Sequence, residues 1–339
     1  MLASRAPSRG MSAMAAVAQM TVTSDVAANL LQANSLVEKA KAEGASMVFL
    51  PEAADFIGES REQTSQLSQP LTGSTVTAFR EMAVKHGLWL SLGGLHVRAR
   101  EGEKTSNTHI LVNAEGDIVA TYAKTHLFDA SVPGKFSLKE SDYVIAGTSM
   151  TPPIETPLGQ LGLGICYDLR FSEHSQALVK AGAQLLTFPS AFTVATGEAH
   201  WESLLRARAI ETQSYVIAAA QTGQHNPKRS SYGHAMIVDP WGVVAAEVKE
   251  GVGVAFAPID LEKIARIRCE MPVQSHRRPD LYGQVRGDNH QLLCLQTINA
   301  DCLCQLILWA AYRLLSFHSW IPVLWSGRDS HVEGCHSSS

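Results

Sequence analysis

The feature that most constrains the fold of this chain is a repeated unit of helix, glycine and short apolar strand. In each unit, apolar residues recur at helical spacing, a glycine ends the helix, and a buried strand follows. The units are 25–43 with Gly44 and 47–50, 75–86 with Gly87 and 88–92, and 173–181 with Gly182 and 184–188. Helices that alternate with strands in this way predict a layered α/β fold.

Two predicted hairpins interrupt this alternation. Strands at 110–112 and 118–120 flank one turn, and strands at 236–238 and 243–245 flank Asp239-Pro-Trp-Gly242, whose sequence suits a type I turn. We find no internal repeat and no linker before residue 283. The sequence therefore predicts one domain over 15–283, an N-terminal extension over 1–14 and an atypical C-terminal tail over 284–339.

Composition limits the class of protein and its partners. The 339 residues carry a net charge of −4 and no run rich in Lys or Arg, so we expect no nucleic-acid partner. Only Cys166 and Cys269 of the six cysteines precede residue 284, which is typical of free thiols in a reducing compartment. The apolar stretch 302–325 contains Arg313 and Pro322, so we expect no membrane span.

The first twenty residues allow two interpretations. They contain two arginines, three serines and no acidic residue, which resembles a mitochondrial transit segment, although a disordered N-terminus fits the same composition. Translation from Met11 would omit both arginines. The expected location is therefore cytoplasmic, mitochondrial or both.

Cys166 is the candidate nucleophile. An apolar, glycine-containing strand over 161–165 ends at this cysteine, and a predicted helix begins soon after it. A nucleophile at a sharp strand-to-helix turn is exposed on one side and surrounded by backbone N–H groups that can stabilise an oxyanion. The alternative is a buried structural cysteine.

Two further charged residues follow predicted strands. Glu52 comes just after 47–50, where burial is expected to raise its pKa and make it a general base for the thiol. Lys124 follows the strand at 118–120 and is a candidate oxyanion partner, which Glu140 would hold in place. Taken singly, each residue is better interpreted as a solvated surface residue. Because strand ends can converge in one crevice, we expect Glu52, Lys124 and Cys166 to meet.

Three segments around these residues resemble the signatures of the nitrilase superfamily of carbon–nitrogen hydrolases, in the same order. They are Phe49-Leu-Pro-Glu-Ala, Tyr122-Ala-Lys-Thr-His-Leu and Gly164-Ile-Cys-Tyr-Asp-Leu-Arg-Phe. The resemblance covers about 15–283 and implies a single-domain, four-layer α-β-β-α sandwich that forms a homodimer or a higher oligomer. It also implies a cysteine thioester mechanism without metal or cofactor, in which a backbone N–H near Tyr167 assists Lys124.

Other segments, among them 87–96 and 228–234, resemble the branch that hydrolyses deaminated glutathione to 2-oxoglutarate and cysteinylglycine. That substrate has two carboxylates, and the candidate residues that would bind it are Arg170, Thr193, His225, Lys228 and Arg229. Three alternatives stay open: an ω-amidase or another small-amide, carbamoyl or nitrile hydrolase of the superfamily, a non-catalytic binding or signalling protein on this fold, and a Cys/His hydrolase of another fold.

Overall fold

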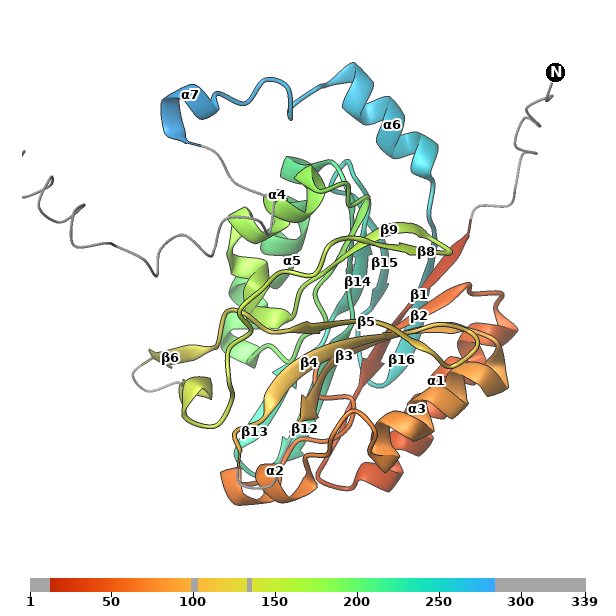
Figure 1. Cartoon of the computed structure of the whole chain (residues 1–339), viewed down its shortest axis with the longest axis vertical. Helices are drawn as coiled ribbons and strands as arrows, with labels where there is room; N and C mark the ends of the chain where they lie inside the picture. The colour runs from red at the N-terminus through yellow and green to blue at the C-terminus, as the bar shows by residue number, and fades with distance from the viewer. Residues whose placement is uncertain (1–12, 99–102, 133–135, 284–339) are drawn as a thin grey trace, which may run out of the picture. The chain divides into compact units, whose positions relative to one another are not determined.

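The structure is a computed structural model that describes residues 13–98, 103–132 and 136–283 (Figure 1). The predicted C-terminal tail and nearly all of the predicted N-terminal extension lie outside these residues. Within the described ranges, no helix is both long enough and apolar enough to cross a membrane.

An eight-stranded sheet contains the first strand of the fold at its centre. Its order is β13-β12-β1-β2-β3-β4-β5, and β16 pairs antiparallel with β1. The bounds are β1 Met14–Met20, β2 Met47–Leu50, β3 Trp89–Val97, β4 Ser106–Val112, β5 Ile118–Ala123, β12 Ala220–Asn226, β13 Arg229–Tyr232 and β16 Gly253–Pro258. Strands β1, β2 and β3 are parallel, so their carboxyl ends share one edge of the sheet.

A six-stranded sheet forms the second β layer, in the order β15-β14-β11-β10-β9-β8. Its bounds are β8 Ile154–Thr156, β9 Gly159–Leu163, β10 Leu185–Thr187, β11 Tyr215–Ala218, β14 Ala235–Val238 and β15 Val244–Val248. A separate two-stranded ribbon consists of β6 (Asp129–Val132) and β7 (Phe136–Lys139). Both predicted hairpins are confirmed, as β4–β5 and β14–β15.

Alternation along β1 shows how the layers stack. Ala15 and Val17 belong to a core shared with the second sheet, whereas Ala16 and Ala18 belong to a core shared with two helices. These helices are α1 (Val26–Ala42) and α3 (Ser74–His86). Because successive side chains of a strand point to opposite faces, β1 is covered on both sides.

The other outer layer consists of α4 (Ser172–Lys180) and α5 (Val194–Thr212), which pack on the second sheet. Figure 1 shows α1 and α3 (orange) on one side of the stacked sheets and α4 and α5 (green) on the other. The expected four-layer α-β-β-α sandwich is thus confirmed. The remaining elements are α2 (Arg61–Leu67), η1 (Glu140–Asp142), η2 (Cys166–Arg170), α6 (Leu261–Glu270) and α7 (Pro279–Tyr282).

Candidate active site

Cys166 lies at the turn between β9 and the 3₁₀ helix η2, as the sequence predicted. Its φ of +46° is in the left-handed region, which residues other than glycine rarely adopt. Its N–H donates to the carbonyl oxygen of Pro189 at 3.0 Å, which fixes the turn against the loop after β10. The residue is only 8% exposed and borders an open cavity of about 1020 Å³. This geometry presents the thiol to the cavity on a rigid backbone.

Glu52 follows β2 and is buried beside Cys166. Its Oε1 accepts hydrogen bonds from Lys124 Nζ at 3.0 Å and from Asn107 Nδ2 at 2.9 Å, and its Oε2 accepts one from the Ala191 N–H at 2.9 Å. It also shares a side-chain hydrogen bond with the Cys166 thiol. The carboxylate is therefore held in one orientation, within reach of the thiol proton.

Lys124 connects two carboxylates in the floor of the cavity. Its Nζ donates to Glu52 and to both oxygens of Glu140, at 3.1 Å and 2.9 Å, and its side chain is only 2% exposed. Glu140 is also buried, and it accepts hydrogen bonds from the Phe128 N–H at 2.7 Å and from Asn107 Nδ2 at 3.2 Å. The structure thus brings Glu52, Lys124, Glu140 and Cys166 together.

The charges in this network determine which of its groups carry a proton in the resting site. Burial acts to lower the pKa of Lys124, but attraction to Glu140 and Glu52 outweighs it and holds the pKa well above its usual value. Burial, together with the charge of Glu52, raises the pKa of the Cys166 thiol. The expectation that burial would raise the pKa of Glu52 is wrong. Burial does act in that direction, but Lys124 and hydrogen bonds from Cys166 and Asn107 lower the pKa overall. The resting site therefore contains a thiol, a carboxylate and an ammonium.

Two groups that hold Glu52 were absent from the predicted site. Asn107 lies on β4 and reaches both Glu52 and Glu140, and the Ala191 N–H comes from the loop after β10. Nothing in the sequence around Asn107 marks it as a site residue, because its partners are 55 and 33 residues away. Only the pairing of β4 with β3 in the folded sheet shows that Asn107 belongs to the site.

Gly94 on β3 lies so close to Asn107 and Glu52 that a side chain at this position would collide with them. Its φ is +67°, and an added Cβ would lie 2.5 Å from Asn107 Oδ1 and 3.0 Å from Glu52 Cγ. We expect Gly94→Ala to displace Asn107 and Glu52, to cost about 1–3 kcal/mol in unfolding free energy, and to reduce kcat by about 10-fold or more. Chemical denaturation and steady-state kinetics would measure both effects.

Gly44→Ala is the matched control for that substitution. Gly44 also has a positive φ, +77°, but nothing lies within 4 Å of an added Cβ. We expect this variant to show the backbone strain without the loss of kcat. An equal loss of kcat in the two variants would show that Gly94 does not act through the site.

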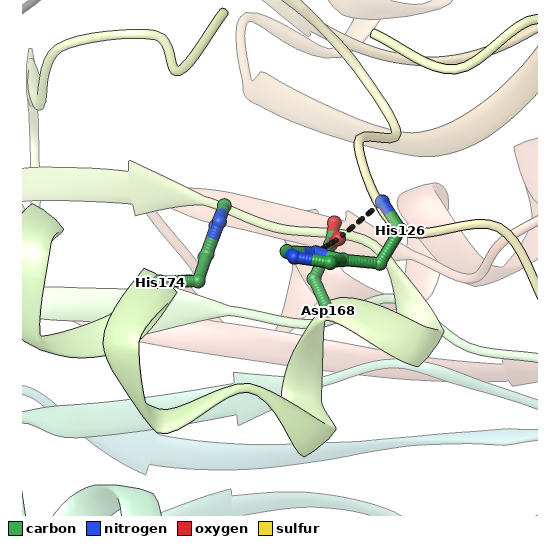
Figure 2. Close-up of side chains that lie close together, drawn as sticks. All are labelled: His126, Asp168 and His174. Carbon is green, nitrogen blue, oxygen red and sulfur yellow. Dashed lines mark hydrogen bonds and ion pairs between the residues drawn. The ribbon is translucent and has the colours of Figure 1, made fainter. Parts of the chain in front are cut away.

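Asp168 links the turn of Cys166 to the turn of Lys124. Its Oδ2 accepts from the Ile165 N–H at 2.9 Å and from the Tyr122 hydroxyl at 2.8 Å. Its Oδ1 accepts from the His126 N–H at 3.2 Å and lies 2.7 Å from His126 Nδ1 (Figure 2). Since Ile165 precedes Cys166 and Tyr122 and His126 flank Lys124, one buried carboxylate positions both segments.

His126, Asp168 and His174 also place possible metal-ligating atoms within 4.8 Å of one another (Figure 2). Both oxygens of Asp168 already accept hydrogen bonds from protein groups, and His174 Nε2 lies 3.1 Å from the carbonyl oxygen of Leu163. A metal ion would have to displace these partners. The donor set therefore fits a positioning network better than a cation site.

Comparison with known proteins agrees with this geometry. The family model described as carbon–nitrogen hydrolase matches residues 14–269. This chain belongs to the carbon–nitrogen hydrolase family. It is 52% identical over 275 residues to the deaminated glutathione amidase of Bos taurus and 50% identical to that of Homo sapiens, and each match covers 80% of this chain and 84% of the relative.

Two solved structures extend the comparison to the fold. The Caenorhabditis elegans NitFhit protein is 51% identical, with a TM-score of 0.77 over 81% of this chain and 67% of that one. Saccharomyces cerevisiae Nit3, a member of branch 10 of the nitrilase superfamily, is 30% identical, with a TM-score of 0.71 over 79% of this chain and 97% of that one. The resemblance to the nitrilase superfamily is confirmed.

The cavity of this carbon–nitrogen hydrolase has predicted cations on two different elements. Arg170 lies on η2, four residues after Cys166, whereas Lys228 and Arg229 lie at the turn between β12 and β13. Thr193, the N-cap of α5, also lines the cavity. His225 is not among the lining residues, because it is buried and its two ring nitrogens lie 2.8 Å from the Val22 carbonyl oxygen and 2.8 Å from Ser231 Oγ.

Aromatic rings hold Arg170 at the mouth of the cavity. Its guanidinium lies 5.8 Å from the ring centre of Tyr167 and 5.4 Å from that of Phe192, and its Nη1 lies 3.2 Å from His200 Nδ1. Cation–π contacts of this kind restrict an arginine without using all five of its N–H donors. Arg170 is therefore both oriented and able to bind an anion.

Proposed function

We propose that this chain is an amidase that hydrolyses deaminated glutathione to 2-oxoglutarate and cysteinylglycine, with Cys166 as nucleophile, Glu52 as base and Lys124 as oxyanion partner. The observation that carries the proposal is the buried contact of Glu52 with both the Cys166 thiol and Lys124, at the floor of an open cavity. Relatives that are 50–52% identical have this activity in their names, which supports the choice of substrate.

Acylation would proceed in two proton-balanced steps. Glu52 accepts the thiol proton while Sγ bonds to the amide carbon, and the carbonyl electron pair moves to the oxygen. Lys124 and the Tyr167 N–H, which lies in the first turn of η2, stabilise that oxyanion. When the carbonyl reforms, the C–N bond breaks and protonated Glu52 gives its proton to the leaving amine. The acyl group remains as a thioester on Cys166.

Deacylation would use Glu52 in the same way, with water as the attacking group in place of the thiol. Glu52, again a carboxylate, takes a proton from a water molecule that attacks the thioester. Collapse of the second tetrahedral intermediate breaks the C–S bond, and the proton returns to Sγ. The ion pair of Lys124 with Glu140 leaves Lys124 a second buried partner while Glu52 is protonated.

The two groups of cations would bind the two carboxylates of the substrate. Arg170 lies on the helix of the nucleophile and suits the 2-oxo acid of the acyl group, with Thr193 beside it on the cavity wall. Lys228 and Arg229 lie on the β12–β13 turn, next to the segment after Asp55, because Asn226 Nδ2 donates to the Gly58 carbonyl oxygen at 3.3 Å. His225 would act indirectly, by holding this turn through Ser231.

Joint replacement of Lys228 and Arg229 by alanine is expected to raise the KM for the dianionic substrate by about 10-fold and to change kcat little, because the reacting atoms are untouched. The control is Lys39→Ala with Lys41→Ala, which removes two exposed cations from the outer helix α1. Initial rates at low and high ionic strength would measure the effect. An unchanged KM would remove the pair from the substrate site.

A panel of substrates tests the proposed function itself. We expect the wild-type protein to release cysteinylglycine and 2-oxoglutarate from deaminated glutathione with a higher kcat/KM than it shows for 2-oxo acid monoamides, carbamoyl compounds or a simple nitrile. A preference for another member of the panel would keep the family and change the substrate. A folded protein that is inert on every member would favour a binding or signalling role.

We also propose that the hydrolase domain extends over 15–283 and that the chain forms homodimers or higher oligomers. Ile210 of α5 and Trp241 and Val243 of the β14–β15 turn are 46%, 59% and 53% exposed, and Gly242 packs against Ile210. Large apolar side chains that gather at one surface are typical of an interface. For location we propose the mitochondrion as well as the cytoplasm, on the basis of the arginine- and serine-containing residues 1–20.

A further inference from the structure

His96 lies beside the catalytic network, although it takes no part in the mechanism above. It is the direct cross-strand partner of Asn107 in the antiparallel pair β3–β4. Side chains of such partners lie on the same face of the sheet, with Cβ atoms about 4.5–5.5 Å apart. Since Asn107 donates to both Glu52 and Glu140, His96 is one side chain away from the catalytic carboxylates. His96 is among the residues that line the same cavity as Cys166.

A buried carboxylate fixes the orientation of that ring. Asp55 is 3% exposed, and its Oδ1 lies 3.0 Å from His96 Nδ1, while its Oδ2 accepts from the His96 N–H at 2.7 Å. The ring of Phe56 stacks on the imidazole with 4.4 Å between centres. Among the described residues, His96 is the only ion-pair partner of Asp55. The histidine is thus held on one nitrogen, one face and its backbone.

The remaining ring nitrogen, Nε2, has no hydrogen bond to any other described residue. A histidine whose Nδ1 donates to a carboxylate presents Nε2 to whatever fills the cavity. An Nε2 that carries a proton can donate a charge-assisted hydrogen bond to a second carboxylate. This geometry suits recognition of an anionic group.

We infer that His96 binds the carboxylate of the leaving amine, with Asp55 as its positioning residue and counter-charge. The inference rests on the proposed function and adds to it which end of the substrate this histidine recognises. The position of His96 within the site is the reason for assigning it to the leaving amine and not to the acyl group. Asn107, the cross-strand partner of His96, donates to Glu52, which protonates the leaving amine in the proposed mechanism, whereas Arg170 lies on the helix of the acylated cysteine.

Two variants separate the role of Nε2 from that of Nδ1. His96→Asn keeps an amide group near the position of Nδ1, where it can still bind Asp55, but has no group at the position of Nε2. His96→Gln places an amide N–H near the position of Nε2. The matched control is His86→Asn, a change on the outer helix α3.

Each variant would be assayed in the full chain with two substrates. Deaminated glutathione releases cysteinylglycine, which has a carboxylate, whereas the monoamide of 2-oxoglutarate releases ammonia, which has none. We expect His96→Asn to raise KM for deaminated glutathione by about 10-fold, as for the loss of one charge-assisted hydrogen bond, with kcat within about twofold. KM for the monoamide should not change, and His96→Gln should recover part of the affinity.

Three results in the variants would overturn the inference while the proposed function stands. Equal KM increases for the two substrates would place the bound carboxylate on the acyl group. A fall in kcat without a change in KM would mean that His96 only positions Asn107. Unchanged kinetics in His96→Asn would remove it from the substrate site altogether. If wild-type protein hydrolyses the monoamide but not deaminated glutathione, the proposed function fails and the inference fails with it.

Discussion

Replacement of Cys166 by alanine is expected to reduce kcat by at least about 10⁴-fold, because the proposed covalent intermediate forms on its thiol. The variant should still fold, since the cysteine borders a cavity and its backbone N–H contact with Pro189 does not depend on the side chain. Substrate binding should persist in Cys166→Ala, because Lys124 and the cavity cations remain. Steady-state assays and equilibrium dialysis with deaminated glutathione would measure the two properties.

The covalent intermediate gives a direct check on the same prediction. Acid quenching of wild-type protein during turnover should leave an acyl mass on the peptide that contains Cys166, and on no other. Cys269→Ala is the control, because Cys269 is the other free cysteine of the described residues and is exposed on α6. That variant should keep full activity. Turnover by Cys166→Ala at more than a few per cent of the wild-type rate would exclude the thioester mechanism.

Replacement of Lys124 by methionine should have the largest effect on stability. Methionine fills nearly the same space without the charge, so Glu52 and Glu140 would face each other in a buried site without a cation. Removing one partner of a buried ion pair costs about 3–5 kcal/mol. Loss of the oxyanion partner should also reduce kcat by about 10²–10³-fold. Urea unfolding and steady-state kinetics would measure these changes.

The pH dependence of the Lys124→Met effect has a definite sign. In wild-type protein the pKa of Glu52 is lowered, so this carboxylate stabilises the fold above its usual pKa of 4.5, and the contribution is lost as pH falls through the lowered value. In the variant, the two unpaired carboxylates favour protonation instead. The deficit in unfolding free energy should therefore be full at neutral pH and should shrink as pH falls toward 4.5.

Lys139→Met serves as the comparison for stability, because Lys139 pairs with Asp142 at 3.3 Å but its side chain is 64% exposed. An exposed pair contributes less than about 1 kcal/mol, so this variant should unfold close to wild type at every pH. A deficit in Lys124→Met that matches the Lys139→Met value would contradict the assignment of a buried charge network.

The elements that could be predicted from the sequence are those determined by short-range signals. Gly87 ends α3 with a φ of +59°, as the residue pattern indicated, and Asp25 caps α1 by accepting from the Ala28 N–H at 3.0 Å. The Asp239–Gly242 turn closes with a hydrogen bond from the Gly242 N–H to the Asp239 carbonyl oxygen at 2.9 Å. In each case the signal and the structure it determines lie within a few residues.

Strand β1 shows why other elements escaped prediction. Its sequence, MAAVAQM, has no alternation of polar and apolar residues, because both of its faces are buried. It pairs with β2, β12 and β16, and the last two lie more than 200 residues away. No local feature of the chain specifies those partners. Helix α5 was similarly not predicted, and Thr193, expected only as a substrate-binding candidate, proves to be its N-cap.

The candidate site shows the same difference between features that short-range signals predict and features that depend on distant residues. Strand-end positions led to Glu52, Lys124 and Cys166, which the structure brings together. The direction of the Glu52 pKa shift was wrong because it depends on Lys124, 72 residues away, whose distance from Glu52 no sequence pattern encodes. Asn107 and His96 escaped notice for the same reason, since their significance lies in the register of β3 with β4.

The proposed nucleophile and its base come from different sheets, since Cys166 follows β9 of the six-stranded sheet whereas Glu52 and Lys124 follow β2 and β5 of the eight-stranded one. Neither layer contains a complete site, so a chain in which both sheets had formed but had not yet stacked would have normal secondary structure and no reactive centre. Catalytic turnover in this protein is therefore a reporter of tertiary assembly. During refolding, the recovery of activity would show when the two layers dock. Circular dichroism would be less specific, because it detects the secondary structure of each layer whether or not the layers have docked.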